Sequence, residues 1–557
     1  MNGDTERRFP GATLLVCVIL SSCATSGVST EAPPTGVPEI DVVELTVEQV
    51  RTDLSEGRYS AVQLTKAFLT RIEAYEDHYN AIISVNPDAL DVAARLDEEL
   101  RTRGSRGPLH GVPVVIKDNI DYAGLTTTAG FSGFSAATGG VDMVPQDDAA
   151  VVERLVTAGA IVLAKTNLPD FAGHGTRTNS SVAGVTLNPY NVEKAPGGSS
   201  GGTATAVNAS FAVAGLGTET GGSIQNPASA QALVGVKPTF GLVPLEGVVP
   251  MSGNVDVVGP LARTVTDAAI ILDVIAGPSD EDERTDAAVG RVPRSGYAAG
   301  LSDVALVGKR FGLVGEGWRT TFLPLAPETE AFYEEAVEAL RREGAEVMDD
   351  PFFGSGFIQK YQERRFARSG ETDEMATYLR GLGEGAPFNS IDEWEELSGR
   401  PFRRGRREGG SREVLDSLRA RSGAAAPRRE TPPDAPSFEE WRGEIQALFR
   451  RVLDENDLDG LFFPQAGAPI PDLVEDPARP DYNPNNHPEL PSNIVNDMGL
   501  PVVTVPFAYY DDGTPFVLAF IGDVWTESEL LGFAFDLEQA TRARIAPRLS
   551  RDPGPGR

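Results

Sequence analysis

Residues 211–224 read FAVAGLGTETGGSI, an apolar run that ends in a polar, glycine-rich turn. Two further apolar runs, GVPVVIKD (111–118) and AIVLAKT (160–166), have the composition of buried strands. The segments DDAAVVERLVTAG (147–159) and VTDAAIILDVIAG (265–277) have the pattern of helices. Short buried strands that alternate with helices predict an α/β layer architecture.

The α/β pattern continues on both sides of this region. Residues 45–103 are mostly helical in their periodicity, and residues 309–347 predict a strand followed by a helix. From about 350 to 438, helical pieces lead into segments rich in Arg, Pro and Gly, which we interpret as a helical excursion followed by a surface linker. We therefore predict one large domain over 41–545, a variable insertion at about 350–438 and a disordered tail at 546–557.

The composition excludes some classes of function. A formal charge of −32, spread along the chain, argues against nucleic-acid binding, which needs clustered positive charge. The chain has only two cysteines and four histidines, and no spacing among them suggests a metal site. We expect neither a metal nor another cofactor.

The N-terminus has the features of an export signal. Arg7 and Arg8 precede the apolar run ATLLVCVIL (12–20), which is too short for a permanent membrane span. The run ends in Leu-Ser-Ser-Cys, which resembles the bacterial lipoprotein processing box, with Cys23 as the lipid-attachment site. A plain secretory signal with a chance cysteine is the alternative.

The lipoprotein interpretation predicts how the N-terminal region is used. Residues 1–22 would be the signal peptide, and residues 23–40, rich in Ser, Thr, Pro and Gly, would be a tether. The mature protein would be extracytoplasmic, in a bacterial cell envelope, and would reach a membrane only through its lipid anchor.

Two serines occupy glycine-rich turns. Ser223 lies in GTETGGSIQNPA (217–228), where glycines allow close approach of a substrate and let backbone N–H groups converge. Such a turn could supply a nucleophile with its oxyanion donors, or it could be an anion-binding or structural loop. Ser199 lies in APGGSSGG (195–202), which could also be a flexible linker. The Gly-Lys-Ser/Thr ending of a Walker motif is missing there, so nucleotide binding is disfavoured.

Lys117 is the candidate base. It ends the apolar run in PVVIKDN (113–119), so a central strand would bury it. Burial disfavours the ammonium form and lowers the pKa, which can make a lysine a usable base. The alternative is a lysine that reaches solvent from a strand end or pairs with Asp118.

Taken together, these motifs resemble the amidase signature family, whose members are serine hydrolases that cleave carboxamides. PVVIKDN, APGGSSGG, GTETGGSI and VGVKPTFGLVP (234–244) occur in the family's order, and the two serines are 24 residues apart, as in the family. The resemblance implies a large mixed β-sheet covered by helices on both faces, with a helical and loop insertion. It is strong over 41–280 and moderate over 440–540.

The resemblance also implies roles for individual residues. Ser223 would be the nucleophile, Ser199 the bridging serine after a cis peptide bond, and Lys117 the base. Backbone N–H groups at Thr220, Gly221, Gly222 and Ser223 itself would hold the oxyanion. Asp118 and Ser200 would orient the triad.

Two positions depart from the family pattern. Glu219 stands where the family commonly has Asp, and Gln225 where it has Arg. Loss of the arginine argues against a close match to the tRNA-dependent amidotransferase subunit. GTET–GSI and ATYLRGLGEGAPFNSIDEWEE (376–396) are similar instead to the branch that contains bacterial peptide amidases.

The sequence thus predicts a serine amidohydrolase that acts on small aliphatic or aryl amides or on C-terminal peptide amides. An esterase with the same triad is one alternative, and a non-catalytic, surface-anchored binding protein is another. The sequence leaves the oligomeric state open.

Overall fold

The computed structural model describes residues 40–363, 371–402, 436–474 and 488–550. From Asp41 onward, the described residues form one compact unit. The predicted signal peptide, the predicted tether except for Ile40, and most of the predicted linker lie outside the described residues. None of the helices in the described ranges is long and apolar enough to cross a membrane.

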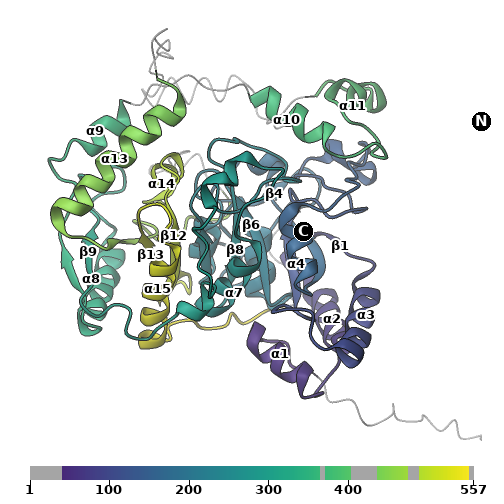
Figure 1. The fold of residues 1–557 in the computed structure, drawn as a ribbon, viewed down its shortest axis with the longest axis horizontal. Coiled ribbons are helices and arrows are strands. Elements are labelled where there is room, and N and C mark those ends of the chain that lie inside the picture. Colours follow the sequence, from purple (N-terminus) through teal and green to yellow (C-terminus); the bar gives the residue numbers. More distant parts are fainter. Residues whose placement is uncertain (1–39, 364–370, 403–435, 475–487, 551–557) are drawn as a thin grey trace, which may run out of the picture. The chain divides into compact units, whose positions relative to one another are not determined.

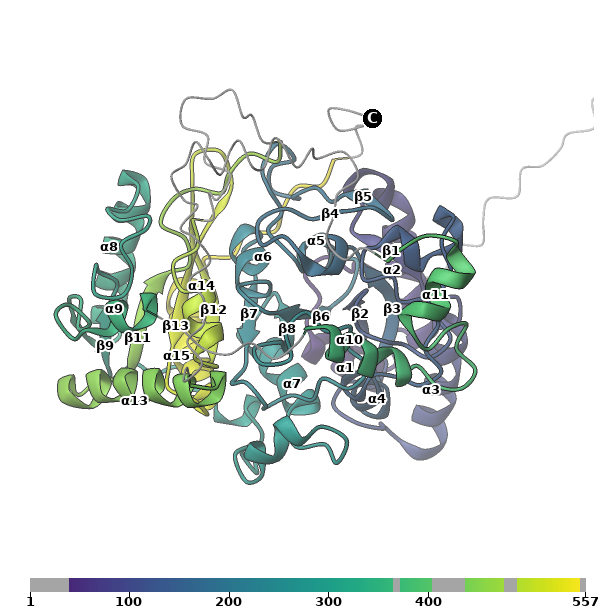
Figure 2. The same cartoon turned by 90° about the horizontal axis from the view of Figure 1, so that it is seen from above.

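An eleven-stranded mixed sheet forms the centre of this unit, in the order β1-β3-β2-β6-β8-β7-β12-β13-β11-β9-β10 (Figures 1 and 2). The large mixed sheet expected from the family resemblance is therefore confirmed. The strands of this sheet are β1 (Ile82–Val85), β2 (Pro113–Lys117), β3 (Ile161–Thr166), β6 (Ala214–Glu219), β7 (Val234–Lys237), β8 (Val257–Ala262), β9 (Arg310–Leu313), β10 (Glu346–Met348), β11 (Gly460–Pro464), β12 (Val502–Tyr509) and β13 (Pro515–Ile521). A separate pair consists of β4 (Asn179–Ser180) and β5 (Gly184–Val185).

Helices cover both faces of the sheet. The α-helices with described residues are α1 (Val47–Ser55), α2 (Ala61–Tyr79), α3 (Ala89–Arg103), α4 (Ala150–Thr157), α5 (Gly201–Asn208), α6 (Gln225–Ala230), α7 (Val265–Ile275), α8 (Pro327–Arg342), α9 (Phe357–Gln362), α10 (Glu371–Arg380), α11 (Ile391–Ser398), α13 (Phe438–Asn456), α14 (Ser492–Asp497) and α15 (Glu527–Thr541). In Figure 2, α5 and α6 lie on one side of the central strands and α7 on the other. Helix α5 packs on β2 and β6, and α7 packs on β7 and β8.

The parallel part of the sheet brings the candidate site together. Strand β2 lies between β3 and β6 and is parallel to both, with Ile116 opposite Leu216. Parallel strands end at the same edge of a sheet, so Lys117, at the end of β2, lies near the turn that follows Glu219 at the end of β6. Strand β8 runs antiparallel to β6.

The sequence missed a strand within residues 45–103, which it predicted to be mostly helical. Residues 45–103 contain α1, α2 and α3 as predicted, but β1 separates α2 from α3 and pairs with β3 in the antiparallel direction. Helix α2 ends at Tyr79, before Asn80 in the left-handed conformation (φ 53°). A strand of four residues at the sheet edge is too short for a clear alternating pattern.

The helical part of the predicted insertion is present as α9, α10 and α11. Trp394 of α11 is 1% exposed, and its indole N–H donates a 2.9 Å hydrogen bond to the carbonyl of Gly133. Its ring also packs against Phe134. The described part of the insertion is thus anchored on the loop that follows β2.

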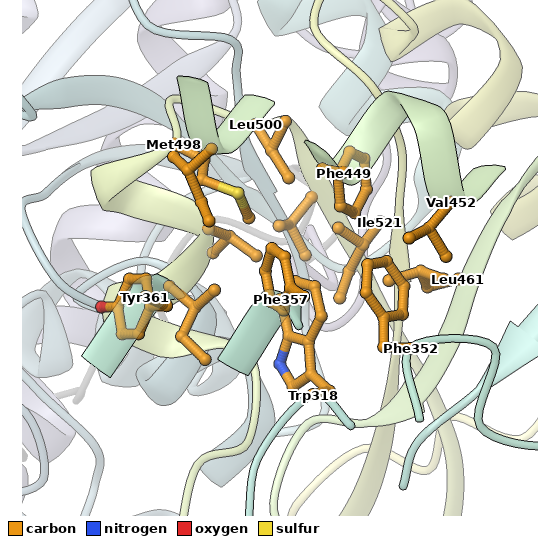
Figure 3. Packing of buried hydrophobic residues seen from close by; sticks show 14 of the residues in the cluster. Trp318, Phe352, Phe357, Tyr361, Phe449, Val452, Leu461, Met498, Leu500 and Ile521 are labelled. Carbon is orange, nitrogen blue, oxygen red and sulfur yellow. The ribbon is translucent and has the colours of Figure 1, made fainter. Parts of the chain in front are cut away.

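A core of buried hydrophobic residues, many of them aromatic, includes side chains from β11 and β13 (Figure 3). Trp318 is completely buried and stacks on Phe357, with ring centroids 5.1 Å apart. Phe352 stacks on Phe449 of α13, which follows the insertion. Because residues from both sides of the insertion share this core, the two parts of the chain are packed together.

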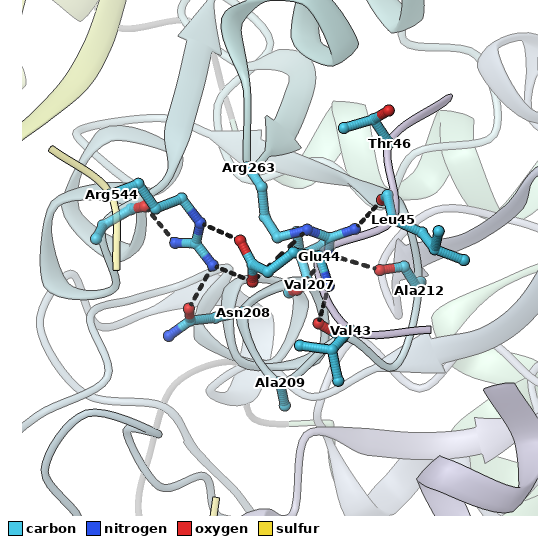
Figure 4. A network of polar contacts seen from close by, with 12 residues as sticks. Val43, Glu44, Leu45, Thr46, Val207, Asn208, Ala209, Ala212, Arg263 and Arg544 are labelled. Carbon is cyan, nitrogen blue, oxygen red and sulfur yellow. Dashed lines mark hydrogen bonds and ion pairs between the residues drawn. The ribbon is translucent and has the colours of Figure 1, made fainter. Parts of the chain in front are cut away.

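Charged residues connect the N-terminal and C-terminal parts of the described unit (Figure 4). Arg544 forms an ion pair with Glu44 at 3.0 Å, and buried Arg263 donates to the carbonyls of Val207 and Ala212 at 2.7 and 2.9 Å.

The predicted tail starts too early. Residues 546–550 belong to the described chain, and the N–H of Ser550 donates to the Tyr79 hydroxyl at 3.0 Å. Residues 546–550 are therefore not part of a disordered tail, and residues 551–557 lie outside the described ranges.

Candidate active site

The side chain of Lys117 is completely buried at the end of β2. Its amine lies 2.7 Å from the hydroxyl of Ser199 and 2.9 Å from the hydroxyl of Thr218, and it donates to the Thr218 carbonyl at 3.2 Å. The predicted alternative of a solvent-exposed lysine is therefore wrong. The fold thus brings Lys117 close to Ser199, which lies 82 residues later in the sequence.

Burial lowers the pKa of Lys117 to about 7, because desolvation penalises the ammonium form. The negative charges of Asp256 and Glu219 act in the opposite direction. Near neutral pH a large fraction of the amine is consequently neutral, which is the form that can accept a proton.

Ser199 precedes α5 and is also completely buried. The peptide bond between Gly198 and Ser199 is cis, as the family resemblance implies. The glycine-rich stretch is no flexible linker: a Cβ on Gly202 would collide with the backbone of Asn167, so only glycine fits this close approach.

Ser223 lies in the turn between β6 and α6 and is 6% exposed, whereas Lys117 and Ser199 are 0% exposed. It is thus the most exposed member of the predicted triad. Its carbonyl accepts a 3.2 Å hydrogen bond from the N–H of Ser200, which joins the nucleophile turn to the start of α5.

The turn around Ser223 presents backbone donors. Among the described residues, none accepts a hydrogen bond from the N–H groups of Gly221, Gly222 or Ser223. Gly222 has φ 115°, which favours glycine at this position. Such N–H groups are suited to an oxyanion.

The two residues expected to orient the triad differ in their contacts. The Ser200 hydroxyl donates to the Thr218 carbonyl at 3.1 Å and fixes the start of α5 to the end of β6. The carboxylate of Asp118 points elsewhere: it forms an ion pair with Lys165 at 3.0 Å and accepts from the N–H of Thr128 at 3.0 Å. Among the described residues, this carboxylate contacts Lys165 and Thr128 and not a triad side chain, and its expected role in orienting the triad stays a prediction.

Sequence reasoning missed Thr218, which contacts the base, and Asn119, which contacts Thr218. The Asn119 amide donates to the Thr218 hydroxyl at 3.0 Å, and that hydroxyl contacts the Lys117 amine. Both residues lie within the motifs that carry the resemblance and near the ends of predicted strands. These positions were the sequence signal that could have identified them as part of the site.

The two departures from the family pattern contact each other. One carboxylate oxygen of Glu219 accepts the backbone N–H groups of Ile224 and Gln225 at 2.7 and 3.0 Å. The other oxygen accepts the side-chain amide of Gln225 and that of Asn496 in α14, the latter at 2.7 Å. Glu219 therefore closes the turn that carries Ser223.

No group of three or more His, Cys, Asp and Glu side chains in the described ranges could hold a metal ion. The candidate reactive groups of the site are a buried lysine and two serines. At the edge of a mixed α/β sheet, these groups define the class of serine hydrolases with a lysine base.

Comparisons with known proteins agree with this class. The Amidase family matches residues 63–531. A glutamyl-tRNA(Gln) amidotransferase subunit of Synechococcus sp. (strain CC9605) is 33% identical over 518 residues, or 90% of this chain and 98% of that protein. The structure of native peptide amidase from Stenotrophomonas maltophilia is 31% identical with a TM-score of 0.71, and the match covers 92% of this chain and 100% of that one.

An amidase family protein from Bacillus anthracis str. Ames has a TM-score of 0.72 at 28% identity, over 92% of this chain and 94% of that one. The chain therefore belongs to the Amidase family. It is an amidase, a hydrolase of amide C–N bonds.

Proposed function

We propose that this amidase forms an acyl-enzyme on Ser223, with Ser199 and neutral Lys117 as its proton relay. The observation that carries the proposal is the 2.7 Å contact between the Lys117 amine and the Ser199 hydroxyl at a buried site. The lowered pKa of Lys117, about 7, supports its use as a base.

The relay balances protons through both half-reactions. Lys117 takes the proton of Ser199 as Ser199 takes that of Ser223, and the Ser223 oxygen attacks the amide carbon. The N–H groups of Gly221, Gly222 and Ser223 stabilise the oxyanion. The proton returns through Ser199 to the leaving nitrogen, which departs as ammonia or an amine. Water then attacks the acyl-enzyme and the relay repeats, releasing the carboxylic acid.

A fluorophosphonate probe tests the nucleophile. Wild-type protein and Ser229→Ala, which changes another buried serine on α6, should both be labelled, whereas Ser223→Ala should not. The absence of labelling in folded wild-type protein would remove the proposed mechanism. Lys117→Ala should slow labelling most severely near neutral pH, and an unchanged rate would remove Lys117 as the base.

For the substrate, we propose small carboxamides or C-terminal peptide amides. The similarity to peptide amidase over nearly the whole chain supports this class. A panel should compare the kcat/KM values of a peptide amide and a small aliphatic amide with those of their matched esters. Ammonia release from the amides is expected, and ester cleavage with no amide cleavage would support an esterase instead.

For the location, we propose a lipid-anchored, extracytoplasmic protein of the bacterial cell envelope. The sequence Leu-Ser-Ser-Cys before residue 24 supports it. Radiolabelled palmitate should enter the wild type and Cys17→Ala in a bacterial host, but not Cys23→Ala. Palmitate that enters none of them would reject the anchor.

A further inference from the structure

Asp256 joins the proposed oxyanion turn to a neighbouring loop. The Thr220 hydroxyl donates a 2.5 Å hydrogen bond to Oδ1 of Asp256. Oδ2 accepts hydrogen bonds of 2.8 Å from the backbone N–H groups of Met251 and Ser252. The residue is 7% exposed, so the carboxylate holds the turn with one oxygen and the loop with the other at a buried position.

The sheet places Asp256 beside Thr220. Strands β6 and β8 are antiparallel, with Glu219 opposite Val257. The residue after β6 and the residue before β8 therefore lie side by side. This is a tertiary contact between residues 36 positions apart.

Asp256 also brings charge to the site. Its charge and that of Glu219 both favour the ammonium form of Lys117. Burial raises the pKa of Asp256 itself to about 6, and the nearby carboxylate of Glu374 in α10 acts in the same direction. Near pH 7, where Lys117 titrates, Asp256 is thus mostly ionised. Asp256 and Glu374 share the wall of a cavity of about 520 Å³.

We propose that Asp256 is a positioning residue for amide hydrolysis: it holds the Thr220 end of the oxyanion turn, and its negative charge acts on the buried base. The inference rests on the proposed roles of Ser223 and Lys117. Loss of the hydrogen bond should displace oxyanion donors and lower kcat more than it changes KM, because the oxyanion forms on the way to the transition state. Loss of the charge should lower the pKa of Lys117 and extend activity to lower pH.

Thr220→Val separates the hydrogen bond from the charge. It removes the hydroxyl, keeps the branched shape and leaves the Asp256 carboxylate in place. We expect kcat to fall about tenfold with KM within about twofold of the wild-type value, and the acid limb of the kcat/KM–pH profile to stay where it is. Thr220→Ser, which restores a hydroxyl, should recover most of the loss.

Asp256→Asn removes the charge at nearly constant shape. We expect a loss in kcat of about tenfold or more, and an acid limb about one pH unit lower than in the wild type. Circular dichroism and Tm establish that each variant is folded. Labelling of the wild type by the fluorophosphonate probe separates the proposed acyl-enzyme from the proposed role of Asp256. No labelling rejects the acyl-enzyme. Labelling of the wild type without the expected changes in kcat and in the acid limb of the variants rejects only the role of Asp256.

An unmoved acid limb in folded Asp256→Asn overturns the inference, as does an equal kcat in Thr220→Val and Thr220→Ser. If Asp256→Asn does not fold, the comparison of Thr220→Val with Thr220→Ser still tests the inference. A kcat several-fold lower in the Val variant supports the role of Asp256, and equal values overturn it.

Discussion

Lys165 and Asp118 form a completely buried ion pair, with 3.0 Å between Nζ and Oδ1. Lys165 lies in β3, beside the strand that ends at Lys117. Successive residues along a strand point to opposite faces, so the side chain of Asp118 points away from the Lys117 amine and contacts Lys165 instead. The Lys117 amine therefore contacts the Ser199 hydroxyl, and the charge of the adjacent Asp118 carboxylate is balanced by Lys165.

Lys165→Met should therefore destabilise the fold strongly. It leaves the Asp118 carboxylate buried without its cation, which costs about 3 kcal/mol or more in the free energy of unfolding. Urea unfolding monitored by circular dichroism measures this loss. The double variant Lys165→Met/Asp118→Asn should lose less than the single variant, because no unpaired charge remains. A single variant as stable as the double would contradict the interpretation.

The pH dependence of catalysis should report the titration of Lys117. The neutral amine is the base, so kcat/KM should rise as the pH increases through about 7 and fall as the ammonium forms below it. Initial rates between about pH 5.5 and 9 on a neutral amide measure this limb. A profile that is flat across neutral pH would show that Lys117 does not titrate during the reaction.

Lys237 should make stability depend on pH in the same range. Burial lowers its pKa to about 7, whereas in the unfolded chain it is near 10.5. Between these values the unfolded state binds the proton and the folded state does not, so the contribution of this group to the free energy of unfolding rises with pH from about 7 to 10. Chemical denaturation at pH 7 and 9 measures the rise, and Lys237→Met should make it smaller. An identical rise in the variant would contradict the prediction.

Glu219→Gln should lower kcat about tenfold to a hundredfold with little change in KM. Both carboxylate oxygens of Glu219 accept hydrogen bonds. A glutamine amide would place an NH₂ group where one of these oxygens faces N–H donors, and this repulsion would disturb the turn that carries Ser223. Steady-state kinetics on folded protein measure the effect. Asn496→Ala is the matched control: it removes a single donor to Glu219 and should cost less. Equal losses would mean that the backbone contacts of Glu219 are unimportant.

Tyr378→Phe tests how the insertion is attached. The Tyr378 hydroxyl of α10 donates a 2.9 Å hydrogen bond to buried Asp121, four residues after Lys117. Removing a hydrogen bond to a buried carboxylate costs about 1.5–3 kcal/mol, so the Tm should fall by a few degrees. Calorimetry measures the change, and an unchanged Tm would show that this contact does not stabilise the fold.

Local sequence patterns predicted much of the candidate site. A run such as PVVIKDN is apolar because the strand is buried, and burial is also the reason that Lys117 can be a base. The glycines beside Ser199 and Ser223 mark places where backbones approach closely, which is a constraint on single residues. The four-residue strand β1 gave too short a pattern, and the partner of Asp118 depends on a neighbouring strand.

By itself, then, the sequence determined the α/β class, the family and the residues of the proposed triad. Buried strands and glycine turns leave recognisable patterns in short stretches of sequence, and the order of these motifs along the chain identifies the family. Only the tertiary structure decided which side chains meet. The parallel register of β2 and β6 brings Lys117 to Thr218, and the antiparallel register of β6 and β8 brings Asp256 to Thr220. These contacts depend on which strands become neighbours, and that choice is made by the packing of the whole sheet.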